Sequence, residues 1–276
     1  MWNRKLCLYA NMNAALPERI RLIGNAGFDA VFFPWEENNP VEECAAAAKE
    51  SGLIIQSIHA PFKTAADMWS DDKEKGDTAL NELKNSLLFC AKHEVPIMVT
   101  HAFIGFNDHT PTAAGVERFG ELVKCADKYG VKIAFENTEG EEYLTALMNA
   151  FKNEPSVGFC WDTGHEMCYN HSNDMLSLYG DKLICTHLND NLGIRNYEGK
   201  ITYLDDLHLL PFDGIADWDN IAARLKAHNY HDILTFELTT VSKPGRHEND
   251  LYAKMLPEEY LAECFKRACK VAQKCQ

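Results

Sequence analysis

The sequence predicts an α/β fold, a single (β/α)8 TIM barrel over residues 1–276. Short β-branched or aromatic runs alternate with longer segments of helical period along the whole chain, which is the pattern of repeated βα units. The length of 276 residues also fits one barrel of about 250 residues. Because no linker rich in Pro, Gly or Ser interrupts the alternation, we expect one domain.

Strands and helices are expected in strict alternation, eight of each. Each strand candidate is a short run rich in β-branched or aromatic residues, and the candidates cover residues 5–10, 30–34, 54–60, 97–102, 132–137, 157–162, 183–189 and 232–238. The helix candidates between them include residues 17–27 and 39–52, each with a proline near its start and a glycine at its end, and residues 112–130. Proline suits the first turn of a helix and glycine suits its C-terminal cap, which supports these boundaries.

Ligand-type side chains end six of these strands. In a TIM barrel, catalytic groups collect where the strands finish. Side chains alternate along a strand, so bulky residues such as Phe135, Trp161 and Phe236 are expected to face the helices. The small or modest residues two places before each strand end point inward with it: Ser57, Val99, Ala134, Cys160, Cys185 and Thr235. The six strand-end residues are His59, His101, Glu136, Asp162, His187 and Glu237.

This convergence of carboxylates and imidazoles predicts a metal site. A single strand-end histidine is explained by structural hydrogen bonding, and a single glutamate by solvation. Six such residues at one place need another explanation, because buried carboxylates repel one another and are costly to remove from water. A divalent cation relieves that cost. A turn at Thr163-Gly164 is expected to bring His165 to the centre that Asp162 faces, since glycine tolerates dihedral angles that branched residues do not.

A long segment, residues 191–219, follows the seventh strand. Loops of this length are usually functional or disordered. Asp206 and His208 lie at alternate positions in it. They are either two further ligands or a loop-capping aspartate and a surface histidine, and both interpretations stay open.

Composition limits the classes of partner. The formal net charge of −14 argues against a polyanionic partner, because nucleic-acid binders need a basic patch. The chain has no apolar run of membrane-spanning length and no signal-peptide pattern. The ten cysteines are scattered without a CxxC pair, which is typical of reduced cysteines. We expect a cytoplasmic protein that binds neither nucleic acid nor membrane, and a homo-oligomer is left open.

Several motifs carry a family resemblance. "AFEN", "WDTGH", "THLND", "DLHLLPFDGIADW" and "TFEL" resemble, in order and approximate spacing, motifs of the xylose-isomerase-like superfamily of (β/α)8 barrels, over nearly the full chain. Its sugar isomerases and ketose epimerases imply one divalent ion held by Glu136, Asp162, His187 and Glu237, with His165 touching the substrate. Three oxygen donors and one imidazole favour Mn²⁺ or Mg²⁺, while Zn²⁺ and Co²⁺ stay open.

The apurinic-site endonuclease branch is the nearest alternative. There, additional histidines and an Asp-x-His pair complete a three-zinc cluster, and His59, His101, Asp206 and His208 occupy comparable positions. An endonuclease needs basic loops that grip a DNA duplex, whereas the candidate loops of this chain are acidic. Aromatic residues near the strand ends either wall a pocket for a small sugar or polyol or pack loops on the barrel rim: Phe33, Trp35, Phe62, Trp69, Phe103 and Phe106.

Further residues are assigned to substrate binding, namely His165, His59, His101, His208, Trp35 and Arg195. Arg195 lies near the substrate-binding arginine that epimerases place after strand seven, but it is not a certain counterpart. The segment "SKPGRH" offers Lys243 and Arg246 as anion contacts or forms an exposed basic turn. Whether the substrate is phosphorylated therefore stays open.

The resemblance implies a metal-dependent sugar or sugar-phosphate isomerase or epimerase that transfers a proton through an enediolate. Glu136 and Glu237 are the expected acid and base. Proton return to the same carbon gives epimerisation, and return to the neighbouring carbon gives isomerisation. The alternatives are an apurinic-site endonuclease-like multi-zinc phosphodiesterase and a non-catalytic sugar-binding barrel, and both candidate glutamates argue against the latter.

Overall fold

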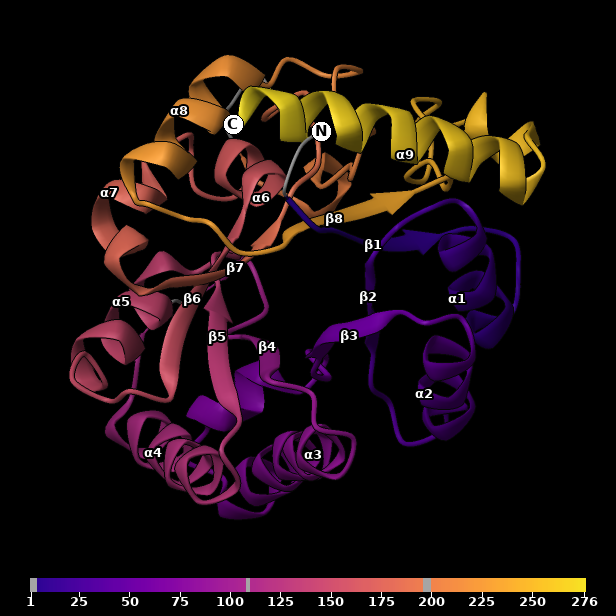
Figure 1. Ribbon diagram of the computed structural model, residues 1–276. Coiled ribbons are helices and arrows are strands. Elements are labelled where there is room, and N and C mark those ends of the chain that lie inside the picture. The colour runs from indigo at the N-terminus through magenta and orange to yellow at the C-terminus, as the bar shows by residue number, and fades with distance from the viewer. Residues whose placement is uncertain (1–3, 108–109, 196–199) are drawn as a thin grey trace.

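Eight parallel strands surround one axis and form a nearly closed barrel with helices on its outside (Figure 1). The structure is a computed structural model that describes residues 4–107, 110–195 and 200–276. The strands are β1 (Leu6–Asn11), β2 (Ala30–Pro34), β3 (Ile54–His59), β4 (Ile97–His101), β5 (Lys132–Glu136), β6 (Val157–Asp162), β7 (Leu183–His187) and β8 (Leu234–Thr239). From β1 to β7 each strand pairs with the next, β1 also pairs with β8, and between β7 and β8 the Leu188 amide donates to the Thr235 carbonyl at 2.8 Å. The predicted (β/α)8 barrel is confirmed.

The helices follow the predicted alternation with one variation. Two short helices, α6 and α7, stand between β6 and β7, where one longer helix was expected. The α-helices are α1 (Leu16–Asn25), α2 (Val41–Glu50), α3 (Lys73–Lys92), α4 (Ala113–Tyr129), α5 (Glu141–Ala150), α6 (Thr163–Cys168), α7 (Met175–Tyr179), α8 (Trp218–Ala227) and α9 (Pro257–Lys274). Short 3-10 helices are η1 (Ala65–Trp69), η2 (Gly180–Lys182), η3 (Tyr203–Asp205) and η4 (Tyr252–Lys254). Within the described ranges, every helix is too short or too polar to cross a membrane.

Local chemistry explains where several helices begin and end. The side chain of Asp72 accepts from the amides of Glu74 and Lys75 and so caps α3. Asp217 caps α8 in the same way. Helix α4 ends at Gly130, whose φ of 69° is in the left-handed region that glycine adopts at a helix C-cap. The capping aspartates and the glycine are visible in the sequence, so these boundaries are set locally.

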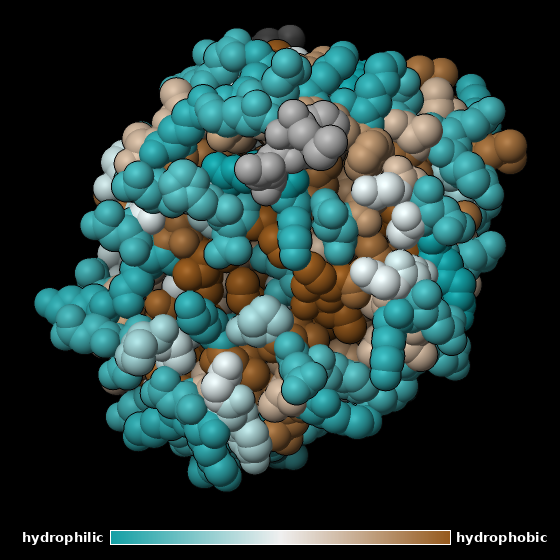
Figure 2. All heavy atoms as spheres, in the orientation of Figure 1, coloured by the Kyte–Doolittle hydropathy of each residue, from teal (hydrophilic) through white to brown (hydrophobic). Residues whose placement is uncertain are grey.

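Strand alternation produces two apolar layers. Inside the barrel, Val99, Ala134, Cys160 and Cys185 are fully buried and pack with Ile97. Between the barrel and the helices lies the larger core, which contains Phe135, Trp161 and Phe236. The predicted alternation is therefore confirmed. In the orientation of Figure 1, apolar side chains also show at the centre of the face, inside a hydrophilic surround (Figure 2).

Candidate functional site

Four ligand-type side chains meet where β5, β6, β7 and β8 approach the C-terminal end of the barrel. Glu136, Asp162, His187 and Glu237 each offer a ligand atom within 4.8 Å of the others. His187 Nδ1 lies 2.8 Å from Glu136 Oε1 and 3.1 Å from Glu237 Oε2. Glu136, Asp162 and His187 are fully buried, and the Glu237 side chain is 17% exposed. The structure thus brings together the four residues expected around one metal ion.

Burial and neighbouring charge act in opposite directions on these carboxylates. Burial raises the pKa of Glu136, but His187, His101 and His59 outweigh it and hold that pKa well below its ordinary value. Burial also raises the pKa of Glu237, yet His187 and His208 lower it to about 2. For Asp162 burial prevails and raises the pKa to about 6. Both glutamates are therefore ionised at neutral pH.

The four-residue group fits a divalent cation. Three carboxylates and one imidazole supply the oxygen and nitrogen donors that Mn²⁺, Mg²⁺ or Zn²⁺ accept. Their crowding leaves carboxylate charge buried, and Asp162 has its pKa raised by that burial. A bound cation removes this penalty, because opposite charge nearby favours the ionised carboxylate.

Two more donor groups adjoin the first. His59 Nε2 and His101 Nε2 lie 3.3 Å and 3.4 Å from Glu136 Oε2. On the other side, Asp206 Oδ1 lies 3.4 Å from His165 Nε2 and 2.9 Å from His208 Nε2. Asp206 and His208 are thus neither a loop cap nor a surface histidine, because both belong to the cluster. The five histidines and four carboxylates form one continuous polar centre.

The histidines differ in their charge preference. Burial lowers the pKa of His101, although Glu136 opposes that effect. Burial also disfavours charge on His208, but Asp206 and Glu237 raise its pKa to about 9. Burial likewise opposes charge on His165, and Asp162, Asp206 and Glu136 outweigh it, so the pKa is raised. His165 and His208, like His187, therefore favour the charged form, whereas His101 favours the neutral form.

The long β7–α8 loop is held in place by Asp190, which the sequence interpretation did not single out. Its carboxylate is fully buried and accepts from the amides of Phe212 and Ala216, and from Trp218 Nε1, each at 2.9 Å. Its amide also bonds to the Leu209 carbonyl. These bonds fold the loop over β7 and place His208 beside Glu237.

Two buried asparagines support Asp162 and were also missed. Asn137 Oδ1 accepts from the Asp162 amide at 2.8 Å, and the Asn137 carbonyl lies 3.0 Å from His165 Nδ1. Asn189 Nδ2 donates to Asp162 Oδ2 at 2.9 Å. Both follow a ligand residue within two positions, in "AFEN" and "THLND", and this repetition was an available signal. They orient ligands in the way that outer-shell partners do in metal sites.

His165 reaches the centre as expected, but for a different reason. It lies in α6, which Asp162 caps by accepting from the His165 amide at 2.7 Å. The prediction that Gly164 supplies an unusual dihedral angle is wrong, because Gly164 is not among the positive-φ glycines. It provides space instead, since a Cβ there would lie 2.0 Å from Asn189 Oδ1.

We therefore expect Gly164→Ala to weaken the site through Asn189. The added methyl group must displace an amide that holds Asp162 Oδ2, and overpacking of this kind typically costs about 1–3 kcal/mol. Urea unfolding and Mn²⁺ titration measure the two losses. Gly120→Ala is the control, because its Cβ would meet Phe151 at an ordinary 3.7 Å. Equal Mn²⁺ affinity in both variants would contradict the role given to Gly164.

The aromatic residues near the strand ends divide into two groups. Phe33 packs against Phe89, and Trp69 packs against Phe119, so both belong to the core outside the barrel. Phe62 instead stacks on His101 with ring centroids 4.8 Å apart and is 36% exposed. Phe62 is therefore placed to contact a ligand at the polar centre.

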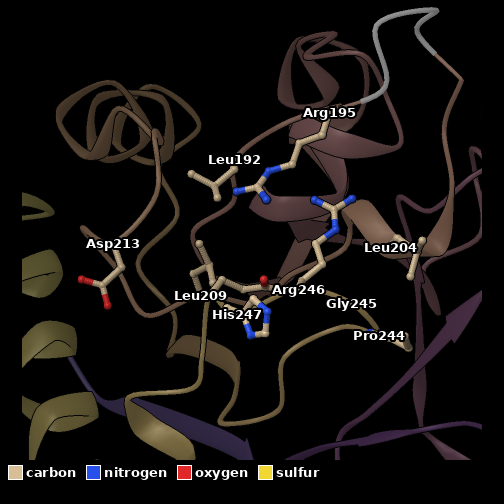
Figure 3. A pocket seen from close by; sticks show the side chains of 10 residues that line it. Leu192, Arg195, Leu204, Leu209, Asp213, Pro244, Gly245, Arg246 and His247 are labelled. Atoms are coloured by element: carbon tan, nitrogen blue, oxygen red, sulfur yellow. The ribbon is translucent and has the colours of Figure 1, made fainter.

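The remaining residues assigned to substrate binding lie farther out. Trp35 is half-buried against the core, and its amide donates to the His59 carbonyl. Arg195 is exposed and lines a neighbouring cavity with Arg246 (Figure 3). Both residues are close to the rim of the barrel, and their contact with a substrate stays a prediction.

A comparison of sequences identifies the family. The model of the xylose isomerase-like TIM barrel family matches residues 20–275. The chain belongs to this family. The uncharacterized protein y4fM of Sinorhizobium fredii is 31% identical in an alignment of 221 residues that covers 68% of this chain and 67% of the relative.

Solved structures share the xylose isomerase-like fold. The IolI protein with a bound zinc atom has a TM-score of 0.77 at 19% identity, covering 98% of this chain and 99% of that one. D-psicose 3-epimerase in the presence of D-fructose has a TM-score of 0.69 at 16% identity, covering 97% and 99%. D-allulose 3-epimerase from Methylomonas sp. in complex with D-allulose has a TM-score of 0.71 at 14% identity, covering 98% of each chain. At these identities the likeness concerns the fold.

Proposed function

We propose that this xylose isomerase-like barrel is a divalent-metal-dependent isomerase or epimerase of sugars or sugar phosphates. The observation that carries the proposal is the pair of ionised glutamates, Glu136 and Glu237, on β5 and β8 around His187 Nδ1. Structures of the same fold support it, because they include one with zinc and epimerases crystallised with ketoses.

Proton transfer is the step that these residues suit. A bound divalent cation supplies Lewis-acid polarisation of the substrate's carbonyl group. Glu237 is ionised and lines the cavity beside β8, so its carboxylate can accept the proton next to that carbonyl. Glu136, on the β5 side, returns a proton to the substrate once it has taken one up from solvent, and Glu237 then releases the proton it accepted. His165, held by the Asn137 carbonyl and Asp206, is placed to donate to a substrate oxygen.

A panel of ketoses and aldoses, with and without phosphate, tests the proposal. We expect conversion of at least one sugar that stops on chelation and returns with Mn²⁺, Mg²⁺, Zn²⁺ or Co²⁺. Chromatography of the products distinguishes epimerisation from isomerisation. A protein that binds a divalent ion and converts none of the panel would argue for a different activity.

The adjoining donor groups favour a second candidate, an apurinic-site endonuclease-like multi-metal phosphodiesterase. Two further groups adjoin the four-residue group: His59 and His101 lie next to Glu136, and His165, Asp206 and His208 form the other group. Such a set has enough ligands for more than one ion. Metal analysis of the purified protein separates the candidates, because one ion per chain favours the sugar enzyme and three favour the phosphodiesterase.

We expect abasic duplex DNA to be a poor substrate beside the sugars. A net charge of −14 disfavours approach to a polyanion, since phosphate neutralisation supplies much of DNA affinity. Incision of a labelled abasic duplex on denaturing gels provides the measurement, with chelated protein as the control. Efficient incision that chelation abolishes would promote the second candidate over the first.

A further inference from the structure

A cavity separate from the metal centre lies between the β7–α8 and β8–α9 loops. This outer cavity has a volume of about 780 Å³, and Arg195 and Arg246 line it from the two different loops. In Figure 3 both guanidinium groups extend from their loops into the space between them. Two cationic groups facing one cavity are notable in a chain whose net charge is −14, because like charges repel unless an anion lies between them.

The outer cavity is a neighbour of the proposed reaction site. A second cavity of about 280 Å³, the inner cavity, is lined by Glu237, His208 and Lys243. Pro244 lines both cavities. The two cavities therefore adjoin at Pro244, with Lys243 on the side of the inner cavity and the two arginines on the side of the outer one.

A tight turn presents these cations. The Arg246 amide donates to the Lys243 carbonyl at 2.9 Å, and Gly245 has a φ of 72°. Proline followed by glycine at positive φ is the signature of a type II turn. The turn directs Lys243 to the inner cavity and Arg246 to the outer one. "SKPGRH" is therefore not a freely exposed basic turn, since the side chains of Lys243 and Arg246 are only 23% and 16% exposed.

Fixed carboxylates hold two of the cations in place. Lys243 Nζ lies 3.3 Å from Asp206 Oδ2, and Arg246 Nη2 lies 2.8 Å from Asp205 Oδ1. Arg246 keeps further N–H donors, because a guanidinium carries five. Arg195 has no hydrogen-bond or ion-pair partner among the residues that the structure describes. The guanidinium group of Arg195 is therefore available to bind a ligand.

The acidic residues of the outer cavity are engaged in the fold. Asp213 pairs with Arg267 at 2.8 Å and also accepts from Tyr252. Glu248 Oε1 accepts from the Lys243 amide at 3.2 Å and so stabilises the same turn, whereas the buried Glu248 Oε2 has no hydrogen-bond partner among the described residues. These contacts leave the guanidinium groups of Arg195 and Arg246 as the groups able to bind a ligand there.

We propose that the outer cavity binds an anionic group, a phosphate or a carboxylate, at the end of the substrate remote from the metal centre. This inference rests on the proposed sugar isomerase or epimerase activity and narrows its substrate to an acidic sugar. Arginine suits the role, because its planar donors match phosphate and carboxylate oxygens in pairs. The site binds at a distance from the reacting carbons, so it contributes to affinity and not to the chemical step.

The test compares Arg195→Met and Arg246→Met with Arg21→Met, an arginine on α1 that pairs with Glu50 and lines neither cavity. KM and kcat are measured for plain ketoses, for the same ketoses as phosphates, and for uronates, which separates phosphate from carboxylate. For the preferred acidic sugar we expect Arg195→Met to raise KM at least about tenfold with little change in kcat. This is the result of losing a charge-assisted hydrogen bond that stabilises the bound substrate and the transition state equally. Arg21→Met should behave as the unaltered protein.

A second measurement keeps the inference separate from the proposed function. Calorimetric titration of the metal-loaded protein with inorganic phosphate should show weaker binding in Arg195→Met than in the unaltered protein. Phosphate bound at the metal would not respond to that substitution, so a loss of affinity identifies binding in the outer cavity. Phosphate binding that depends on Arg195 in a protein that converts no sugar would retain the anion site and reject the proposed activity. Conversion of plain and acidic sugars with equal KM, unchanged in Arg195→Met, would overturn the anion site and retain the activity. If Arg195→Met impaired only the incision of abasic duplex DNA and no sugar conversion, the outer cavity would be a site for the DNA backbone. That result would also overturn the proposed anion site for an acidic sugar.

Discussion

Asp162→Ala should abolish activity and reduce Mn²⁺ affinity by more than the ~10–100-fold that loss of an outer-shell partner typically costs. Asp162 is fully buried at the end of β6 and shares a 4.8 Å cluster with Glu136, His187 and Glu237. Removing it takes one of three carboxylates from the donor set. Burial has already raised the pKa of Asp162 to about 6, so its charge is costly without a cation and its loss should not by itself unfold the metal-free barrel.

Melting curves with and without Mn²⁺ test this expectation alongside direct titration. A ligand at one hundred times its Kd stabilises the native state by about 2.7 kcal/mol, and this increment should vanish in Asp162→Ala. Because Asp162 also caps α6, Asp217→Ala is the matched control: it removes the comparable cap of α8 away from the centre. That control should lose about 0.5–2 kcal/mol of stability and keep its Mn²⁺ affinity. Full metal retention in Asp162→Ala would remove Asp162 from the ligands.

The strand ends were predictable because two local rules agree there. Alternation along β5 and β6 fixes which side chains face the axis, as the separate layers of Ala134 and Phe135 demonstrate. Parallel pairing then brings the strand ends to one rim, where His101 is in register with Glu136, and Asp162 with His187. Alternation is local, and the parallel pairing joins neighbouring units of the predicted βα repeat, so both follow from the sequence pattern.

The loops were less predictable because their positions depend on distant partners. Asp206 and His208 reach the centre since Asp190 binds amides more than twenty residues along the chain. Gly164 is required by Asn189, a residue from the next strand's end, and not by its own dihedral angle. The position of Arg246 at the outer cavity depends on its ion pair with Asp205, which belongs to the other loop. None of these contacts has a periodic signature.

The proposed acid and base roles of Glu136 and Glu237 lead to a second prediction with a large expected effect on turnover. Glu136 and Glu237 approach His187 Nδ1 from β5 and β8, and β6 and β7 lie between these two strands around the barrel. Glutamine at either position keeps the size and one coordinating oxygen but cannot accept a proton. We expect Glu136→Gln and Glu237→Gln each to lose turnover by at least the ~10²–10⁴-fold typical of a positioned acid or base. Glu36→Gln, a rim glutamate paired with Lys63, is the control and should keep full turnover.

Solvent isotope exchange distinguishes proton transfer from hydride transfer. In deuterated water the native enzyme should exchange the hydrogen next to the substrate's carbonyl group, because a carboxylate that has taken a proton can trade it with solvent before returning it. A variant that keeps one glutamate should still exchange that hydrogen on its own side of the substrate while forming little product, and mass spectrometry of the recovered sugar measures this. Glu237 is the more open of the two, so Glu136→Gln should retain more exchange than Glu237→Gln. Conversion by the native enzyme with no exchange at all would favour a hydride shift, and the acid–base roles of both glutamates would then be wrong even though the metal centre remained.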